Sequence, residues 1–321
     1  MLRAPCQETL LTQDYKEMNI KDTLKKNKLI IKTYDYFLRC YFRLLTIISP
    51  ELNTRARYKH SFKKKLNLEN PQSFTEKLLK LKLTRYNSDP LVKQCADKYA
   101  VREYIKKCGL EHILIPLLAS YDKPEEIDFN SLPEQFAMKW NYGCGYNIIC
   151  PNKSKLNYKE TVKKLKKWSR ERLYLDYSEM QYKDVNKKVL VEKYLKPSKG
   201  LLPADYKVYC FNGRPMAILF INDRDTEDKT AAFFDLDWNF ISYTGKGAYK
   251  EMKVMPEKPK CLDEMIKVSQ KLSAPFEFVR MDYYEVDDKL YFGEMTFTPA
   301  GGLFTSECII NGKTMGELLQ I

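Results

Sequence analysis

Hydrophobic residues recur at helical spacing in the first part of the chain. Between residues 29 and 48, charged residues occur every three or four positions and apolar residues fill the rest, which predicts an amphipathic helix. The charged stripe of this helix consists of Lys32, Asp35, Arg39 and Arg43. So many charges argue against a membrane-spanning helix. Two placements remain open: the helix docks on the main domain, or it lies in a membrane interface with its basic residues toward lipid headgroups.

Capping residues mark where further helices begin and end. Ser73 and Glu76 have the spacing of a capping box and predict a helix that continues to about residue 86. Asp89, which precedes a proline, predicts the start of a second helix. Asp97 predicts the start of a third, which we expect to end at Gly109 because glycine accepts the left-handed conformation after a helix.

After residue 116 the pattern changes to short β-rich runs separated by turns. Strands are predicted over 135–140, 147–150, 189–195, 205–211, 214–221, 231–234, 240–243, 278–284 and 289–299, and helices over 157–170 and 260–273. Asn212-Gly213 between two strands is a strong hairpin signal. Helices followed by an antiparallel sheet are typical of an α+β fold. We expect four regions: a helical extension (1–54), a helical/αβ region (55–134), a small subdomain with a glycine-rich loop (135–195) and a C-terminal subdomain (196–321).

The composition limits the function. The 321 residues are 44% hydrophobic and 30% charged, as in an ordinary folded protein. The net charge of +13 suits anionic partners, but no RNA-recognition, zinc-finger or basic-heptad motif occurs, so no nucleic-acid partner is expected. Two histidines, and nine cysteines without a CxxC pair, argue against structural zinc and a histidine-based triad. We expect no cleavable signal peptide and a cytoplasmic protein, with a peripheral contact at the inner face of the membrane through residues 29–48 as an open option.

The most informative segment is the predicted hairpin of residues 278–299. Each strand carries one acidic residue among apolar neighbours, Asp282 in the first and Glu294 in the second. Because a buried carboxylate is unfavourable without a cation, two facing carboxylates indicate a divalent metal; incidental surface acids are the alternative. Side-chain alternation places Thr296 on the face of Glu294. A two-residue turn would put Asp282 on the opposite face, so we expect a three-residue loop (286–288) that brings the three together.

Glycines and cations elsewhere predict a nucleotide site. Lys139 ends a strand and precedes a loop containing Gly143 and Gly145, whose backbone can approach phosphate oxygens. Glu192 lies in an apolar strand, where its carboxylate needs a donor such as an adenine amino group. A plain hairpin and a salt-bridged edge strand are the alternatives.

Three further cations lie near these groups in the predicted pattern. Lys207 and Arg224 flank one predicted hairpin, and Arg280 shares a face with Asp282, two residues further on. Their positions suit phosphates or a substrate carboxylate. Surface ion pairs are the alternative for each cation taken singly.

The order of these motifs resembles that of the ATP-grasp ligases, and most closely their TupA-like branch, which occurs with surface-polysaccharide and teichuronopeptide biosynthesis. The resemblance covers roughly residues 55–300, and four segments carry it: 70–77, 97–103, 205–213 and 292–299. It implies an ATP-grasp fold, in which two α+β subdomains clamp ATP. It departs from the family at Thr296, where many relatives place a metal-binding asparagine, and slightly in the tail 299–302.

The resemblance also implies roles for the candidate residues. For the nucleotide these are phosphate contact by Lys139, loop closure by Gly143 and Gly145, and adenine binding by Glu192 and the backbone of Lys193, Tyr194 and Leu195. For catalysis and the metal they are phosphate or substrate binding by Lys207, Arg224 and Arg280, and magnesium binding by Asp282 and Glu294, with Thr296 in the second magnesium position.

The implied activity is an ATP- and Mg²⁺-dependent carboxylate–amine ligation through an acyl phosphate. The expected partners are an anionic, uronic-acid-containing capsule or cell-surface glycan and an amino acid or amine. Three alternatives remain open: a sugar kinase on the same scaffold, a polyanion binder without catalysis, and a glycosyltransferase. The last is suggested by Asp235-x-Asp237, but that motif lies in a predicted exposed turn.

Overall fold

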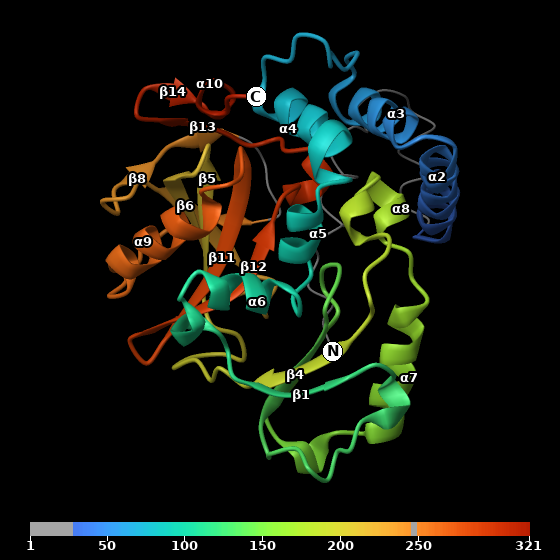
Figure 1. Ribbon diagram of the computed structural model, residues 1–321, viewed down its shortest axis with the longest axis vertical. Helices are drawn as coiled ribbons and strands as arrows, with labels where there is room; N and C mark the ends of the chain where they lie inside the picture. The colour runs from blue at the N-terminus through green and yellow to red at the C-terminus, as the bar shows by residue number, and fades with distance from the viewer. Residues whose placement is uncertain (1–27, 245–248) are drawn as a thin grey trace.

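The computed structural model describes residues 28–244 and 249–321, and Figure 1 shows helices packed around two main β-sheets. Residues 1–27, which belong to the predicted extension 1–54 and to which the signal-peptide expectation refers, lie outside the described residues. The mixture of helices and antiparallel sheets confirms the α+β class. The described helices are α2 (Lys28–Ile48), α3 (Pro50–Phe62), α4 (Phe74–Leu81), α5 (Pro90–Ala96), α6 (Val101–Lys107), α7 (Tyr158–Ser169), α8 (Tyr174–Tyr177), α9 (Leu262–Ser273) and α10 (Met315–Leu318).

The predicted helix caps are present. Ser73 Oγ accepts a hydrogen bond from the Glu76 amide at 3.3 Å, and the Glu76 carboxylate accepts one from the Ser73 amide at 3.2 Å. Asp89 caps α5 by accepting from the amide two residues on, at 2.8 Å. Asp97 accepts in the same way at 2.7 Å ahead of α6, and Gly109 follows that helix with φ 68°. Local capping chemistry therefore fixes the boundaries of these short helices.

The smaller sheet holds four antiparallel strands in the order β1-β4-β2-β3. They are β1 (Leu117–Tyr121), β2 (Phe136–Trp140), β3 (Asn147–Cys150) and β4 (Val189–Lys193), of which β1 was not among the predicted strands. Helix α7 covers one face, where Leu165 and Trp168 form a core with Met138 and Val191. Alternation then directs the even-numbered Glu192 of β4 to the other face.

The larger sheet runs in the order β10-β7-β6-β5-β11-β12, with β8 paired to β7. Its strands are β5 (Asp205–Phe211), β6 (Arg214–Asn222), β7 (Thr230–Phe234), β8 (Phe240–Ile241), β10 (Lys250–Glu251), β11 (Phe278–Val286) and β12 (Lys289–Thr296), and a small third sheet holds β9 (Tyr243–Thr244), β13 (Glu307–Ile310) and β14 (Lys313–Thr314). Helix α9 covers one face, where Ser269 Oγ donates to the Tyr283 hydroxyl at 3.0 Å. The opposite face carries charged side chains, among them Lys207, Asp282 and Glu294.

The hairpin β11–β12 corrects the expected loop length. Val286 pairs with Lys289, so the turn has two residues, Asp287 and Asp288, both with left-handed φ, and the expectation of a three-residue loop is wrong. A β-bulge after Asp282 shifts the register instead, so that Asp282 pairs with Glu294 and the extra residue is Gly293. The two carboxylates therefore share a face, for a reason that the turn alone does not provide.

Helix α2 docks through its charged stripe. Arg39 and Arg43 both bind the buried Asp176 of α8, at 2.8 Å and 2.5 Å, and Thr46 donates to the carbonyl oxygen of Leu175 at 2.7 Å. Figure 1 shows α2 at the outer edge of the molecule beside α3 and α8. No helix among the described residues is both long enough and apolar enough to cross a bilayer.

Candidate functional site

A row of charged side chains crosses three neighbouring strands of the larger sheet. Lys207 of β5 pairs with Asp282 of β11, which pairs with Glu294 of β12. Lys207 Nζ binds the Asp282 carboxylate directly, and Arg280 forms a bidentate pair with the same carboxylate at 2.6 and 2.7 Å. Both oxygens of Asp282, a residue only 2% exposed, are thus held by cations. Burial alone would lower the pKa of Arg280, but the Asp282 charge raises it above its ordinary value.

Glu294 connects this row to the helical region. Lys98 Nζ lies 3.0 Å from its carboxylate, and Thr296 Oγ1 donates to Glu294 Oε1 at 3.2 Å. Arg280 is farther away, at 3.7 Å. Burial would raise the pKa of Glu294, but the charges of Lys98, Lys207 and Arg280 outweigh it and hold the pKa well below its usual range. The carboxylate is therefore ionised at neutral pH, with Lys98 as its nearest cation.

Asp205 extends the network toward the β6–β7 side. It lies in β5 two residues before Lys207, and its carboxylate binds Lys207 Nζ at 2.9 Å and Arg224 Nη2 at 3.0 Å. The Arg224 guanidinium also lies 5.5 Å from the centre of the Tyr284 ring. Asp205 is 2% exposed, and its Oδ1 atom has no hydrogen-bond partner within the described chain. A buried oxygen of this kind is unfavourable until a donor or cation reaches it.

A second cluster lies on the inner face of the smaller sheet. Lys139 Nζ binds Glu192 Oε2 at 2.7 Å, and Arg102 of α6 lies 3.7 Å from Glu192 Oε1. Arg102 also donates to the carbonyl oxygen of Ile115 at 3.0 Å, which fixes its position. The predicted donor for Glu192 is thus supplied here by Lys139.

Lys98 connects the glycine loop of the smaller sheet to Glu294 of the larger sheet. Gly143 and Gly145 have φ values of 69° and 77°, and the Gly143 carbonyl oxygen accepts from Lys98 Nζ at 2.7 Å. Asn141 helps to fix the position of Lys98. Its side-chain amide donates to the Asp97 carboxylate at 2.7 Å, and its backbone carbonyl oxygen accepts from the backbone amide of Lys98 at 2.8 Å. One lysine therefore joins the loop of the smaller sheet to the carboxylate row of the larger sheet.

The remaining predicted nucleotide residues follow β4. Lys193 is exposed, and its amide donates to the carbonyl oxygen of Pro116 at 2.9 Å. Tyr194 donates its hydroxyl to the Leu201 carbonyl oxygen at 2.9 Å, and Leu195 packs in a small core with Ile115. None of these three takes part in the charge network, and their role with adenine remains a prediction.

Sequence reasoning missed three residues that complete the network: Lys98, Arg102 and Asp205. Lys98 lies in the turn between α5 and α6, more than a hundred residues from Glu294, and no periodicity links the two. The available signal was its place beside the Asp97 cap, within a segment that carries the family resemblance. Asp205 carried the same signal, because it lies within the resembling segment 205–213.

The Asp235-x-Asp237 motif has a local structural role. The Asp235 carboxylate accepts from the amides of Asp237 and Asn239 at 2.9 and 2.7 Å and from the Asn239 side chain at 2.9 Å. Both oxygens are used to close the turn between β7 and β8. This motif therefore does not offer a prepared metal site.

Magnesium suits the carboxylate row if phosphate completes its coordination. Among the described residues, no group of three or more histidine, cysteine or acidic side chains could hold a metal ion alone. Mg²⁺ in phosphate-transferring enzymes is typically held by one or two carboxylates together with substrate phosphates. Asp282 and Glu294, paired on adjacent strands, provide that donor set, and the orphaned oxygen of Asp205 lies in the same network.

Comparison with known proteins agrees with this architecture. The family model described as TupA-like ATP-grasp matches residues 76–318. No curated protein matches the chain. Among solved structures, the chain is similar to D-alanine–D-alanine ligase from Bacillus anthracis complexed with ATP (17% identity, TM-score 0.39, 64% of this chain and 56% of that one). It is also similar to L-amino acid ligase from Bacillus licheniformis (12% identity, TM-score 0.40, 66% of this chain and 45% of that one). A third similar structure is the ATP-grasp ligase PsnB complexed with minimal precursor, Mg and ADP (12% identity, TM-score 0.35, 70% of this chain and 58% of that one). The chain thus spans roughly half the length of the structures it matches.

Proposed function

Because the chain belongs to the TupA-like ATP-grasp family, we propose that it is an ATP-dependent carboxylate–amine ligase acting on an anionic surface polysaccharide or its precursor. The observation that carries this proposal is the register of β11 and β12, which pairs Asp282 with Glu294 on one face. Lys98 bonds both Glu294 and the glycine loop, so the carboxylates and the loop form one site.

ATP and magnesium would be shared between the two sheets. Asp282 and Glu294 would hold Mg²⁺, with Thr296 beside them, and the bound ion would neutralise charge on the transferred phosphate. Lys139 and the amides around Gly143 and Gly145 would face the phosphates. The adenine would lie near Glu192, at the end of β4, and near the backbone of residues 193–195.

The chain supplies charge and alignment and needs no nucleophile of its own. A substrate carboxylate oxygen would attack the γ-phosphorus of ATP, which breaks the bond to the β-phosphate oxygen and releases ADP. An amine nitrogen would then attack the acyl carbon, release inorganic phosphate and lose a proton. Lys207, Arg224 and Arg280, which pair with Asp282 and Asp205 here, would neutralise the phosphates and the substrate carboxylate during these steps.

The net charge supports the acceptor that we propose. A net charge of +13 favours encounter with a polyanion, and uronic-acid glycans provide both negative charge and carboxylates to activate. An amino acid or amine would be the second substrate. Phosphorylation of a sugar hydroxyl would use the same ATP site, and product mass separates an amide from a phosphate ester.

The test is ADP release with matched variants. The protein is incubated with ATP, Mg²⁺, uronic-acid oligosaccharides and a panel of amino acids, and products are analysed by mass spectrometry. Asp282→Asn and Glu294→Gln should each lower turnover at least a hundredfold, as expected when a charge-stabilising ligand is lost. Asp237→Asn, which changes an acid of the DxD motif, should retain wild-type turnover. Full activity of both carboxylate variants, or transfer from UDP-sugars without ATP, would refute the proposal.

We further propose that α2 attaches the enzyme to the inner face of a membrane, where ATP is supplied. Arg39 and Arg43 dock on Asp176 and Phe42 is buried beside them, but most other large apolar side chains of the helix face outward. Nine large apolar or aromatic side chains of this helix are at least 40% exposed: Ile30, Ile31, Tyr34, Tyr36, Phe37, Tyr41, Leu44, Ile47 and Ile48. Such a surface is larger than the patches normally left in water and fits the acyl–headgroup boundary of a bilayer.

Vesicle flotation tests this attachment. The wild-type protein should float with vesicles of anionic phospholipid, and Phe37→Ser combined with Ile47→Ser should abolish flotation. Val254→Ser is the matched control, because Val254 is 82% exposed and lies far from α2 in sequence. Equal flotation of the double variant and the wild type would contradict membrane attachment.

A further inference from the structure

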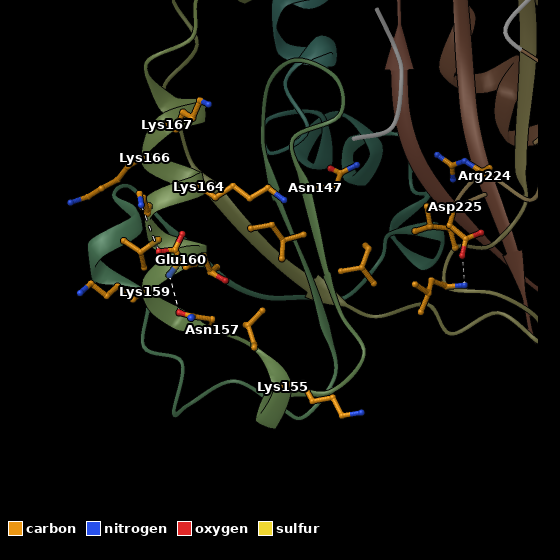
Figure 2. A pocket seen from close by; sticks show the side chains of 18 of the residues that line it. Asn147, Lys155, Asn157, Lys159, Glu160, Lys164, Lys166, Lys167, Arg224 and Asp225 are labelled. Atoms are coloured by element: carbon orange, nitrogen blue, oxygen red, sulfur yellow. Dashed lines mark hydrogen bonds and ion pairs between the residues drawn. The ribbon is translucent and has the colours of Figure 1, made fainter. Parts of the chain in front are cut away.

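A basic cavity lies beside the smaller sheet. It adjoins the carboxylate network, formed by Asp205, Asp282 and Glu294 with their cations, at one residue, Arg224. It has a volume of about 1420 Å³ and is bounded by α7, by the edge strand β3 and by the segments 201–202 and 224–229. Figure 2 shows α7 on one side and Arg224 with Asp225 on the other, with the β2–β3 hairpin between them. We call this cavity the α7 trough.

The charge of the α7 trough is strongly one-sided. Nine of its lining residues are basic: Lys155, Lys159, Lys163, Lys164, Lys166, Lys167, Arg170, Arg224 and Lys229. Only three are acidic, and two of these have partners: Glu160 lies 3.7 Å from Lys163, and Asp225 accepts from the Leu201 amide at 2.8 Å. A concave surface with this excess of one charge concentrates ligands of the opposite charge.

The basic side chains differ in direction along α7. Figure 2 shows Lys164 extending toward Asn147 on β3 and Lys155 extending toward the Arg224 side, whereas Lys159 and Lys166 point away to the opposite side of the helix. Lys166 is paired there with Glu125 at 2.6 Å. All four lysines line the trough, but only the charged ends of Lys164 and Lys155 extend toward its other walls.

One wall of the trough belongs to the charge network. Arg224 lines the trough, and its Nη2 atom lies 3.0 Å from Asp205, which in turn binds Lys207 at 2.9 Å. Burial would lower the pKa of Arg224, but the charge of Asp205 raises it, so the guanidinium stays charged. A ligand lying in the trough therefore ends beside the residues assigned to phosphate and substrate binding.

We propose that the α7 trough holds the body of a polyanionic, carboxylate-bearing polysaccharide whose end enters the carboxylate network past Arg224. The proposal rests on the proposed ligase function and assigns a place to its acceptor. Spaced lysines match the spaced carboxylates of a polyuronate. The strand β3 ends the smaller sheet, so its outer edge offers backbone groups, and Asn147 an amide, to sugar hydroxyls.

The lining argues against a nucleic acid as the occupant. No aromatic side chain is among the residues that line the trough. Proteins that bind single-stranded nucleic acid stack bases on aromatic rings, at about 1–3 kcal/mol per base. A flexible acidic glycan needs only charge and hydrogen bonds.

The experiment compares two variants with the same change in net charge. Lys155→Ala with Lys167→Ala removes two lysines that line the trough, neither of which forms an ion pair within the described residues. Lys64→Ala with Lys267→Ala is the control, because both lysines are exposed and neither lines the trough. Binding of oligogalacturonate to each full-length protein is measured by calorimetry at two salt concentrations, together with ATP binding and thermal unfolding.

We expect the trough variant to bind oligogalacturonate at least tenfold more weakly and with a smaller salt dependence, and the control to change by less than about threefold. ATP binding and the melting temperature should stay at wild-type values in both. Equal weakening in the two variants would overturn the trough, because only net charge would then matter. Tighter binding of a single-stranded oligonucleotide than of oligogalacturonate would also overturn it.

The outcome is separable from that of the ligase proposal. Loss of oligogalacturonate binding in the trough variant, with no ATP turnover in any protein, would support the trough and refute the ligase. Amide formation on a uronate by a trough variant with unchanged KM for the glycan would support the ligase and refute the trough.

Discussion

The proposed metal site depends on Gly293, because Gly293 is the extra residue of the bulge that brings Asp282 and Glu294 to one face. Gly293→Ala tests this directly. A Cβ atom at position 293 would lie 2.9 Å from the Asp282 carbonyl oxygen and 3.2 Å from a ring carbon of Tyr284. The first contact is with backbone, which cannot move aside as a flexible side chain can.

Two responses are open to the strands, and each disturbs the site. The strands can separate locally, which as an overpacking strain costs about 1–3 kcal/mol of unfolding free energy. Alternatively, the bulge can close, and a one-residue shift then turns Glu294 to the face covered by α9. If turnover depends on the position of Glu294 as proposed, kcat should fall at least tenfold, while the melting temperature should fall by only a few degrees.

Gly312→Ala is the matched control. Gly312 has φ 75° with open space around its Cβ position, so alanine there costs about 1–2 kcal/mol through backbone strain alone. The two variants should have similar melting temperatures, and only Gly293→Ala should lose ADP release. Wild-type turnover in Gly293→Ala at a comparable loss of stability would show that the bulge is not needed to place the carboxylates.

Two further predictions concern single contacts. Lys98→Met removes a charged hydrogen bond to Glu294 worth about 1.5–3 kcal/mol, so kcat/KM should fall about ten- to a hundredfold. The Lys98 charge also helps to lower the pKa of Glu294, so the acid limb of the pH–rate profile should move to higher pH, and an unchanged acid limb would contradict this coupling. Burial would raise the pKa of Asp176, but Arg39 and Arg43 lower it below its ordinary value. The ion pairs of Asp176 with the two arginines therefore stabilise the docked α2 at pH values above the unfolded pKa of about 4, and this stabilisation is lost as the pH falls through the folded pKa. Asp176→Asn should therefore speed amide exchange in α2 at neutral pH, and equal protection in variant and wild type would refute the role of the pair.

Local rules accounted for much of the fold. The capping residues Ser73, Asp89 and Asp97 begin helical segments at the expected places, and Asn212-Gly213 turns β5 into β6. In each case the residues that determine the conformation lie within a few positions of one another. Strand β1 escaped prediction because its alternation is short and its half-buried pattern depends on pairing with β4, some seventy residues away.

The site was harder to predict because long-range geometry determines it. Asp282 and Glu294 were predicted as a pair, but their shared face was attributed to the loop length. The missed signal was Gly293, because a glycine inside a strand often marks a bulge. The docking of α2 was also partly unexpected, because amphipathic helices usually bury their apolar side, whereas here the docked face combines Phe42 with Arg39 and Arg43. What reversed it was Asp176, a buried carboxylate in a separate part of the chain that needs cationic partners.

The pairing of the carboxylates with cations is compatible with a metal site, and it suggests how the site responds to its ligands. Four cations (Lys98, Lys207, Arg224 and Arg280) share three carboxylates (Asp205, Asp282 and Glu294), so the network is close to neutral. If ATP and Mg²⁺ bind as proposed, a metal ion alone would meet cations that already hold Asp282, and ATP alone would meet cations that are already paired with carboxylates. When both bind, Lys207 and Arg280 would exchange the Asp282 carboxylate for phosphate oxygens and that carboxylate would turn to the metal, so no buried charge would be left without a partner. Such an exchange would favour joint binding of nucleotide and metal over binding of either one.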